Sequence, residues 1–244
     1  MDSASSDRPE RRTAVIAKEL RRFKIDLAAL SETRLADKGQ LKQEKAVDEP
    51  RIHGVGFAIK NNLITHLPKS PVGINEWLMT LRLKLMNNQM ATAVSAYAPA
   101  LDSQDEDKEA FYAALDNILT NIPKEDKVLL LRDFNARVGK DHKVWKATMG
   151  KEGVGNINSN GVVLLSKCAE HDLVITKQEI SSKRNKFKTS WMHPRPKCWH
   201  LIDYVIVRAK DRKDVKITRA MTGADDCWTD HRLIHSIMTI RLMH

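Results

Sequence analysis

The sequence predicts an α/β domain, in which helices pack against β-sheets. Helical and strand patterns alternate from end to end of the 244 residues, as they do in layered folds that contain both element types. No Pro/Gly/Ser-rich linker, low-complexity tract or internal repeat interrupts them, so we expect one domain over residues 8–242 and a disordered N-terminus over residues 1–7. With 42% hydrophobic and 30% charged residues, the composition is that of a globular protein with a sizeable core.

The N-terminal half predicts two helices and four strands. Residues 11–23 place Ile16, Leu20 and Phe23 on one face, which predicts an amphipathic helix. The apolar runs 25–30 and 55–59 predict strands, and residues 78–85 and 90–97 predict a hairpin. The strongest helix is expected over residues 105–122, which carry a single apolar stripe. Ser103, just before this range, and Glu106, within it, have the spacing of a capping box.

The C-terminal half continues the alternation. The run Val128–Leu131 predicts a short buried strand, and a Gly/Asn-rich loop is expected from Gly139 to Asn160. Asn160 is a residue type that caps helices, which predicts a helix over residues 161–171. Further strands are expected at residues 173–176, 189–192, 201–207, 215–220 and 235–242.

Composition excludes several classes of protein. No apolar run approaches the roughly 20 residues of a membrane helix, so we expect no membrane partner. The first residues lack the apolar stretch of a secretory signal, which favours an intracellular protein. Three cysteines, an odd number, argue against a disulfide scaffold, and their spacing to His193 and His200 fits no paired zinc-ligand pattern.

Positive charge is concentrated in one stretch. The net charge is +10, and residues 183–219 hold most of it, with Trp191 and Trp199 interleaved among the lysines and arginines. Such a basic stretch with aromatic residues suits a nucleic-acid backbone, although a solvated face with aromatic residues in the core explains it equally well. The cluster from Lys183 to Lys188 is also compatible with a nuclear address.

Polar residues stand at the ends of the apolar strands, where layered folds concentrate their sites. Taken singly, each of these residues is more often an ordinary turn residue. As an ordered set they predict a catalytic or binding site: Glu32, Tyr97, Asp133, Asn135, Asp203, Asp230 and His231.

The motifs around these residues resemble the endonuclease/exonuclease/phosphatase superfamily, and within it the endonuclease domain of LINE-type retrotransposons of the RTE clade. They are, in order along the chain, SETRL, SAYAP, RDFNARVG, NSNG, TSWMHP, HLIDYVIVR and WTDHRLI. The resemblance implies a DNase I-like fold of four layers, with two mixed β-sheets packed as a sandwich and flanked by helices. It also implies hydrolysis of phosphodiesters, with DNA as partner and Mg²⁺ as cofactor, Mn²⁺ being an alternative; protein partners are unknown.

Roles follow from the same resemblance, motif by motif. Glu32 resembles the metal-binding carboxylate, and Asp230 would lie near the metal. Asp133 would position or deprotonate the attacking water. These residue types suit the chemistry, because hard cations prefer carboxylate oxygens and water attack needs a positioned proton acceptor.

The remaining carried-over roles concern the scissile phosphate. His231 would lie beside it, oriented by Asp203, while Asn135 would stabilise charge on the phosphoryl oxygens. Tyr97 and Asn160 would contact the same phosphate. Hydrogen-bonding and cationic groups are what the developing negative charge requires.

Three departures from the family pattern bear on activity. We expect the fold to lack the family's first strand and a further strand between Glu44 and Asp48. Arg132 stands where the family has a glycine that permits an unusual backbone angle or close packing. Its side chain either reaches the Asp133 carboxylate or points to the opposite face of the strand.

Three readings of function therefore remain open. The first is an active, metal-dependent DNA endonuclease. The second is a catalytically inactive, truncated domain that still binds nucleic acid or a protein. The third is a poorly folding transposon remnant with no selected role.

Overall fold

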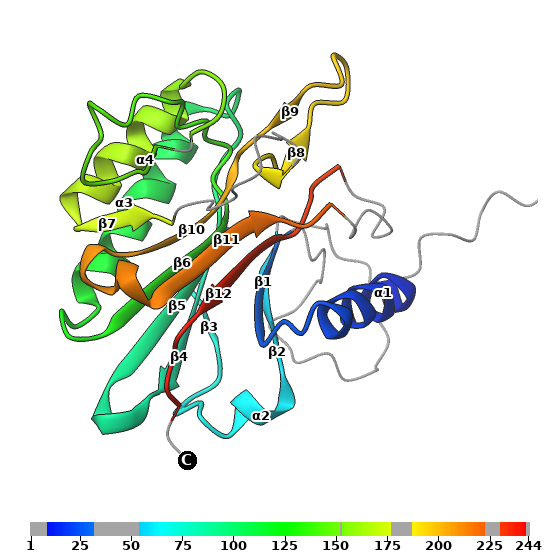
Figure 1. Ribbon diagram of the computed structural model, residues 1–244, viewed down its shortest axis with the longest axis vertical. Helices are drawn as coiled ribbons and strands as arrows, with labels where there is room; N and C mark the ends of the chain where they lie inside the picture. Colours follow the sequence, from blue (N-terminus) through cyan, green and yellow to red (C-terminus); the bar gives the residue numbers. More distant parts are fainter. Residues whose placement is uncertain (1–8, 32–53, 152, 177–186, 223–229, 243–244) are drawn as a thin grey trace, which may run out of the picture.

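The computed structural model describes residues 9–31, 54–151, 153–176, 187–222 and 230–242 (Figure 1). The predicted disordered residues 1–7, Glu32, the segment between Glu44 and Asp48 and residues 183–186 of the cluster Lys183–Lys188 lie outside these ranges. No helix within the described ranges is long and apolar enough to cross a membrane.

A six-stranded mixed β-sheet forms the centre of the molecule (Figure 1). Its strands, in spatial order, are β3 (Val72–Gly73), β4 (Leu78–Lys84), β5 (Met90–Tyr97), β6 (Lys127–Asp133), β10 (Asp203–Arg208) and β7 (Leu173–Ile175). The predicted hairpin of β4 and β5 is confirmed, with Asn87 and Asn88 both at positive φ in the short 3₁₀ turn η1 (Met86–Asn88) between them. Strands β5 and β6 are parallel, whereas β10 runs antiparallel to β6.

Two helices cover one face of this sheet, α3 (Asp105–Asn121) and α4 (Ser159–Glu170) (Figure 1). The apolar stripe of α3 packs into the main core, in which Phe111 and Leu115 are almost completely buried. On the sheet side, Val128 and Leu130 of β6 point into the same core. Leu129 contributes to a second cluster, so β6 is buried on both faces, as its unbroken apolar sequence predicts.

The opposite face carries two separate two-stranded sheets. One pairs β1 (Leu27–Ser31) with β2 (Val55–Ile59), and the other pairs β11 (Val215–Ala220) with β12 (Ile234–Met238). Strand β1 packs against β5 and β6, and β12 packs against β10. The second layer of the predicted sandwich is therefore present as two pieces among the described residues, rather than as one continuous sheet.

This second layer covers the central sheet incompletely. The cluster beneath it contains five fully buried residues, whereas its neighbours on the layer itself, such as Phe57, Ile59 and Met238, are only partly buried. Among the described residues the first element is α1 (Pro9–Arg22), which lies beside β1 and β2 (Figure 1). Residues 1–8 and 32–53 lie outside the described ranges, so the expected absence of two strands stays a prediction.

Short elements complete the architecture. They are the helical turns α2 (Asn61–Ile64) and η3 (Ala209–Asp214) and the small hairpin of β8 (Trp191–Met192) and β9 (Trp199–His200). The β8–β9 hairpin projects beyond the end of the central sheet at which β5 and β6 terminate (Figure 1).

Two helix starts differ from the sequence predictions. Helix α3 begins after Gln104, whose side chain makes no capping hydrogen bond, so the predicted capping box of Ser103 and Glu106 is wrong. Three acidic residues in its first turn complement the helix dipole instead. Helix α4 is capped by Asn158, whose side chain accepts from Gly161 N, so the prediction of Asn160 as the cap is also wrong.

Candidate functional site

Three of the predicted site residues lie side by side on neighbouring strands. Tyr97 ends β5, Asp133 ends β6 and Asp203 begins β10. The strand register pairs Asp133 with Tyr97 on one side and with Asp203 on the other. Because β10 is antiparallel to β6, its first residue meets the last residues of β5 and β6 at one rim of the sheet.

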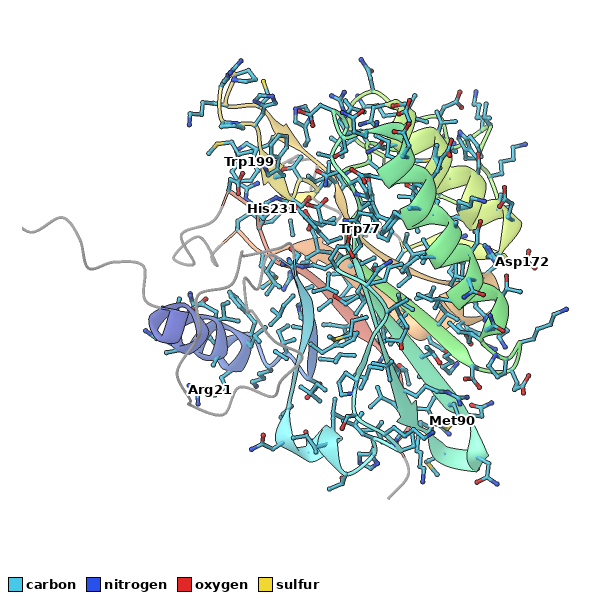
Figure 2. All side chains as sticks on the ribbon, turned by 180° about the vertical axis from the view of Figure 1, so that it is seen from behind. Arg21, Trp77, Met90, Asp172, Trp199 and His231 are labelled. Atoms are coloured by element: carbon cyan, nitrogen blue, oxygen red, sulfur yellow. The ribbon has the colours of Figure 1, made fainter. Side chains whose placement is uncertain are left out.

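His231 completes this arrangement from the segment before β12. Its Nδ1 lies 3.0 Å from Asp203 Oδ2, and its Nε2 lies 3.8 Å from Asp133 Oδ2. We call Asp133, Asp203 and His231 the Asp–His–Asp trio. Both carboxylates are buried, while the imidazole is about a quarter exposed, so His231 is the member that solvent or a ligand can reach. Figure 2 shows His231 and Trp199 at the same end of the molecule.

Burial and charge set the protonation states of the trio. Burial would raise the pKa of Asp203, but the charge and hydrogen bond of His231 outweigh it and hold that pKa below its usual value. Burial would lower the pKa of His231, but the charge and hydrogen bond of Asp203, together with Asp133, raise it to about 9. Burial and the charge of Asp203 raise the pKa of Asp133 to about 7. Near neutral pH the trio thus holds a protonated imidazole, an ionised Asp203 and an Asp133 close to its midpoint.

The loop after β6 is held against the site by two asparagines. Asn135 has a φ of 46°, its backbone N–H donates to Asp133 Oδ1, and its side-chain Nδ2 donates to Ala98 O. Asn160 Nδ2 donates to Pro99 O and to Asn135 O. In this structure Asn160 thus holds the loop that carries Asn135, and its predicted contact with a phosphate stays a prediction.

The NSNG motif explains why this loop keeps its position. Asn158 Oδ1 accepts hydrogen bonds from the backbone N–H groups of Arg137 and Gly161. A Cβ at Gly161 would lie only 2.0 Å from Arg137 O, which no side chain permits. The glycine therefore allows α4 to approach the loop after β6 closely.

Ser190 and Trp191 support the trio, although the sequence analysis named neither of them as a site residue. Ser190 Oγ accepts from the backbone N–H groups of Ile202 and Asp203, and its own hydrogen bond to the Asp203 carboxylate lowers the pKa of that group. Trp191 donates from Nε1 to Asp230 Oδ2 and forms a β-bridge with His231. The motif TSWMHP contains both residues, so the resemblance marked the segment but not their roles.

Arg132 has the backbone conformation that its place in the motif predicts. Its φ is 110°, in the region that favours glycine. Its side chain forms no ion pair with Asp133, and its Nε is buried without a hydrogen-bond partner among the described residues. Its positive charge nevertheless lowers the pKa of both Asp133 and Asp203.

The trio offers a ligand set for a divalent cation. Ligand atoms of Asp133, Asp203 and His231 all lie within 4.8 Å of one another. Carboxylate oxygens suit Mg²⁺ and Mn²⁺, so the donor types fit. The Asp230 carboxylate accepts a hydrogen bond from Trp191 Nε1. Glu32 follows Ser31, the last residue of β1, and lies outside the described residues.

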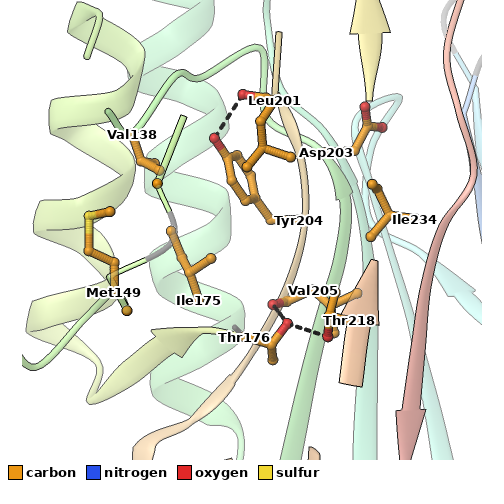
Figure 3. Close-up of a pocket in the computed structure, with 12 residues that line it drawn as sticks. Val138, Met149, Ile175, Thr176, Leu201, Asp203, Tyr204, Val205, Thr218 and Ile234 are labelled. Carbon is orange, nitrogen blue, oxygen red and sulfur yellow. Dashed lines mark hydrogen bonds between the residues drawn. The ribbon is translucent and has the colours of Figure 1, made fainter. Parts of the chain in front are cut away.

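A small cavity of about 30 Å³ lies behind Asp203 (Figure 3). It is lined mainly by apolar side chains such as Met149 and Ile175, and it ends at Thr176 and Thr218, whose hydroxyls lie 2.8 Å apart. Its volume is that of about one water molecule.

Comparison with curated proteins identifies homologues over nearly the whole chain. No family model matches the sequence. Craniofacial development protein 2 of Bos taurus is 25% identical over 237 residues, which cover 93% of this chain and 38% of the relative. The protein of the same name from Tragulus javanicus is also 25% identical, over 93% of this chain and 40% of the relative. The chain thus spans about two fifths of the length of these relatives.

Comparison with solved structures identifies the fold. The 3′ phosphatase NExo from Neisseria, bound to a product DNA hairpin, matches with a TM-score of 0.66 and 15% identity, over 94% of this chain and 95% of that one. The endonuclease domain of TRAS1, a telomere-specific non-LTR retrotransposon, matches with a TM-score of 0.60 and 12% identity, over 93% and 92%. The AP endonuclease LMAP from Leishmania major gives 0.65 and 12%, over 94% and 83%. The chain has the fold of these nucleases and phosphatases, and the curated proteins to which it is similar are craniofacial development protein 2.

Proposed function

We propose that the chain is a metal-dependent phosphodiester hydrolase that acts on DNA. The observation that carries this proposal is the Asp–His–Asp trio, in which a partly accessible imidazole lies between two buried carboxylates, 3.0 Å from one and 3.8 Å from the other. Its structural neighbours are nucleases and phosphatases, one of them bound to a DNA hairpin, which supports the same class of substrate. The net charge of +10 favours a polyanion.

The protonation states of the trio suit water attack on a phosphate. The ionised form of Asp133 accepts a proton from the attacking water. His231, held in its protonated form by Asp203 at 3.0 Å, stabilises the negative charge that develops on the phosphoryl oxygens. Asn135, fixed by its bonds to Asp133 and Ala98, supplies a further polar group at the same rim, beside Tyr97.

The carboxylates at this rim would hold the cation. The predicted metal-binding carboxylate is Glu32, with Asp230 near the metal, and the Asp133 and Asp203 carboxylates add oxygen atoms that lie within 4.8 Å of one another. Mg²⁺ commonly binds through one or two carboxylates and retains several waters. When bound, the cation supplies Lewis-acid stabilisation of phosphoryl charge.

A nicking assay on supercoiled plasmid tests the proposal. We expect the protein to nick with Mg²⁺ and not with chelator. His231→Ala should lower the rate by about 10²- to 10³-fold, the usual cost of removing one group that stabilises developing negative charge. The matched control is His171→Ala, because His171 also pairs with an aspartate, Asp116, at 3.0 Å but lies on the outer helices. Equal rates for the two variants would contradict the proposal.

The second candidate is a domain that binds nucleic acid without cleaving it, and Arg132 is the observation that favours it. A strained arginine with a buried, unbonded Nε stands directly beside the proposed base. If it impairs the chemistry, Arg132→Gly should raise metal-dependent nicking by at least about tenfold, a barrier change of roughly 1.4 kcal/mol. His231→Ala in that background should abolish the gain. Salt-sensitive DNA binding without nicking in either background would establish the binding domain instead.

A further inference from the structure

A positively charged hollow lies at the end of the central sheet opposite the trio. It is formed by the 3₁₀ turn η3, the start of β11 and the residue after β7, and its volume is about 450 Å³. We call it the η3 hollow. Seven residues line it, four of which are cations: Thr176, Ala209, Lys210, Arg212, Lys213, Val215 and Lys216.

The 3₁₀ geometry of η3 sorts its charges by sign. The sequence AKDRKD has charged residues at five of six positions. With three residues per turn, side chains three apart lie on the same side. Lys210 and Lys213 therefore share one face, and Asp211 and Asp214 share another.

The acidic face of η3 is turned toward the protein, where Lys127 pairs with both aspartates. Lys127 Nζ lies 2.7 Å from Asp211 Oδ1 and 2.7 Å from Asp214 Oδ2. Asp211 is buried, and neither aspartate lines the hollow. This pairing offsets one of the two negative charges and holds both carboxylates away from the lining of the hollow, which the four cations form.

The cations of the η3 hollow are not neutralised by carboxylates in the described part of the chain. Lys210 Nζ donates to the backbone carbonyl of Lys124, which leaves its charge in place. Lys213 and Lys216 are exposed and Arg212 is half-buried, and none of the three forms an ion pair with a described residue. Four positive charges thus surround one concave surface with no acid in its lining.

The η3 hollow is separate from the trio, because the two lie at opposite ends of β10. Asp203 and Arg208 are the first and last residues of β10, so strand rise alone places η3 about 17 Å beyond Asp203. Thr176 lines the η3 hollow and also the small cavity behind Asp203 (Figure 3). In Figure 1 the orange turn η3 and the β8–β9 hairpin lie at opposite ends of β10.

We propose that the η3 hollow binds the phosphodiester backbone of a nucleic acid, as a contact distinct from the trio. Lysines are compact point charges that attract phosphates without reading bases, and three of the four cations are lysines. No aromatic side chain lines the hollow, so the chemistry is that of backbone attraction and not of base stacking. The contact requires no hydrolysis and stands whether or not the trio is active.

Binding of a labelled DNA duplex by fluorescence anisotropy, in chelator and over a range of salt concentrations, tests this site. The test variant combines Lys210→Gln, Arg212→Gln, Lys213→Gln and Lys216→Gln. Each phosphate contact contributes about 0.9 to the slope of log K against log salt. We expect the variant to lose about 2–4 units of that slope while nicking at the trio is measured separately.

A control with the same loss of charge separates the site from the overall field of the protein. It combines Lys18→Gln, Lys69→Gln, Lys84→Gln and Lys146→Gln, four exposed lysines on separate elements. Its slope should change by less than about one unit, because scattered charges make no shared contact. Equal loss in the two variants, or no loss in either, would overturn the proposal.

Two further measurements complete the test. If the fourfold variant melts below wild type, Lys213→Gln with Lys216→Gln serves in its place, because both side chains are fully on the surface, and half the loss of slope is expected. Vesicles with anionic phospholipid are the second probe. Loss of vesicle binding with duplex binding unchanged would assign the η3 hollow to a membrane surface and overturn the nucleic-acid contact.

Discussion

Replacing Arg132 by glycine should stabilise the fold. Arg132 holds a φ of 110°, and a non-glycine residue in such a region is strained by about 1–3 kcal/mol. Glycine adopts the angle freely, but its greater freedom in the unfolded chain offsets about 0.5–1 kcal/mol of the gain. Arg132→Gly should therefore be more stable than Arg132→Ala by about 1 kcal/mol, since alanine removes the guanidinium but keeps the strained Cβ.

Thermal melts and urea titrations of wild type and the two variants measure this difference. For a chain of 244 residues, 1 kcal/mol corresponds to about 2–4 °C in melting temperature. Both variants remove the buried, unbonded Nε, so that contribution cancels when they are compared with each other. An alanine variant as stable as the glycine variant would refute the argument from backbone strain.

The same pair of variants separates strain from charge. The Arg132 guanidinium lowers the pKa of Asp133, so both variants should raise that pKa above about 7 and by the same amount. Less Asp133 is then ionised at neutral pH, and the rise of the nicking rate with pH should move to higher pH in both. A shift in the glycine variant alone would show that backbone position, and not the guanidinium charge, controls Asp133.

Three further predictions rest on contacts described above. Asp203→Asn should lower the pKa of His231 from about 9 toward its ordinary value, which NMR titration measures. In wild type the raised pKa contributes stability that is fully present below pH 6.5 and is lost as the pH rises through about 9. A His231 pKa that stays at about 9 in the variant would contradict the pairing with Asp203. Phe111→Ala in the main core should cost about 3–5 kcal/mol in urea denaturation, and a loss below 1 kcal/mol would mean that this helix face is not packed as described. Thr218→Val should cost about 1–3 kcal/mol by leaving the buried hydroxyl of Thr176 with one partner fewer, whereas Thr218→Ser, which keeps a hydroxyl, should cost less.

Sequence patterns predicted the central sheet because burial there is nearly complete. The run Val128–Leu131 has apolar side chains on both faces of β6, so no alternation was needed to recognise it. The placement of polar residues at strand ends also predicted that Asp133 and Asp203 would meet, since a strand tip fixes position along the sheet. His231 joined them from a different layer, which only the ordered resemblance of the motifs could indicate.

Details that depend on tertiary hydrogen bonds were not predictable in the same way. Asn158 and Asn160 are equally good capping residues by type, and the choice between them depends on Arg137 N, which reaches Asn158 across the loop. The basic stretch gave no sign that it divides between the β8–β9 hairpin and η3, because that division follows from the length and direction of β10. The separation of the second layer into two pieces likewise has no local signal in β1 or β12.

The unequal cover on the two faces of the central sheet has a consequence for motion. Local opening costs least where few apolar side chains are fully buried, so amide hydrogens of β11 and β12 should exchange faster than those of β5 and β6. Asp133 and Asp203 belong to the central sheet, whereas His231 lies three residues before the start of β12. A partial opening of the β11–β12 pair would withdraw the imidazole and leave both carboxylates in place, so the fraction of assembled trio is governed by the stability of one hairpin and not by that of the whole domain.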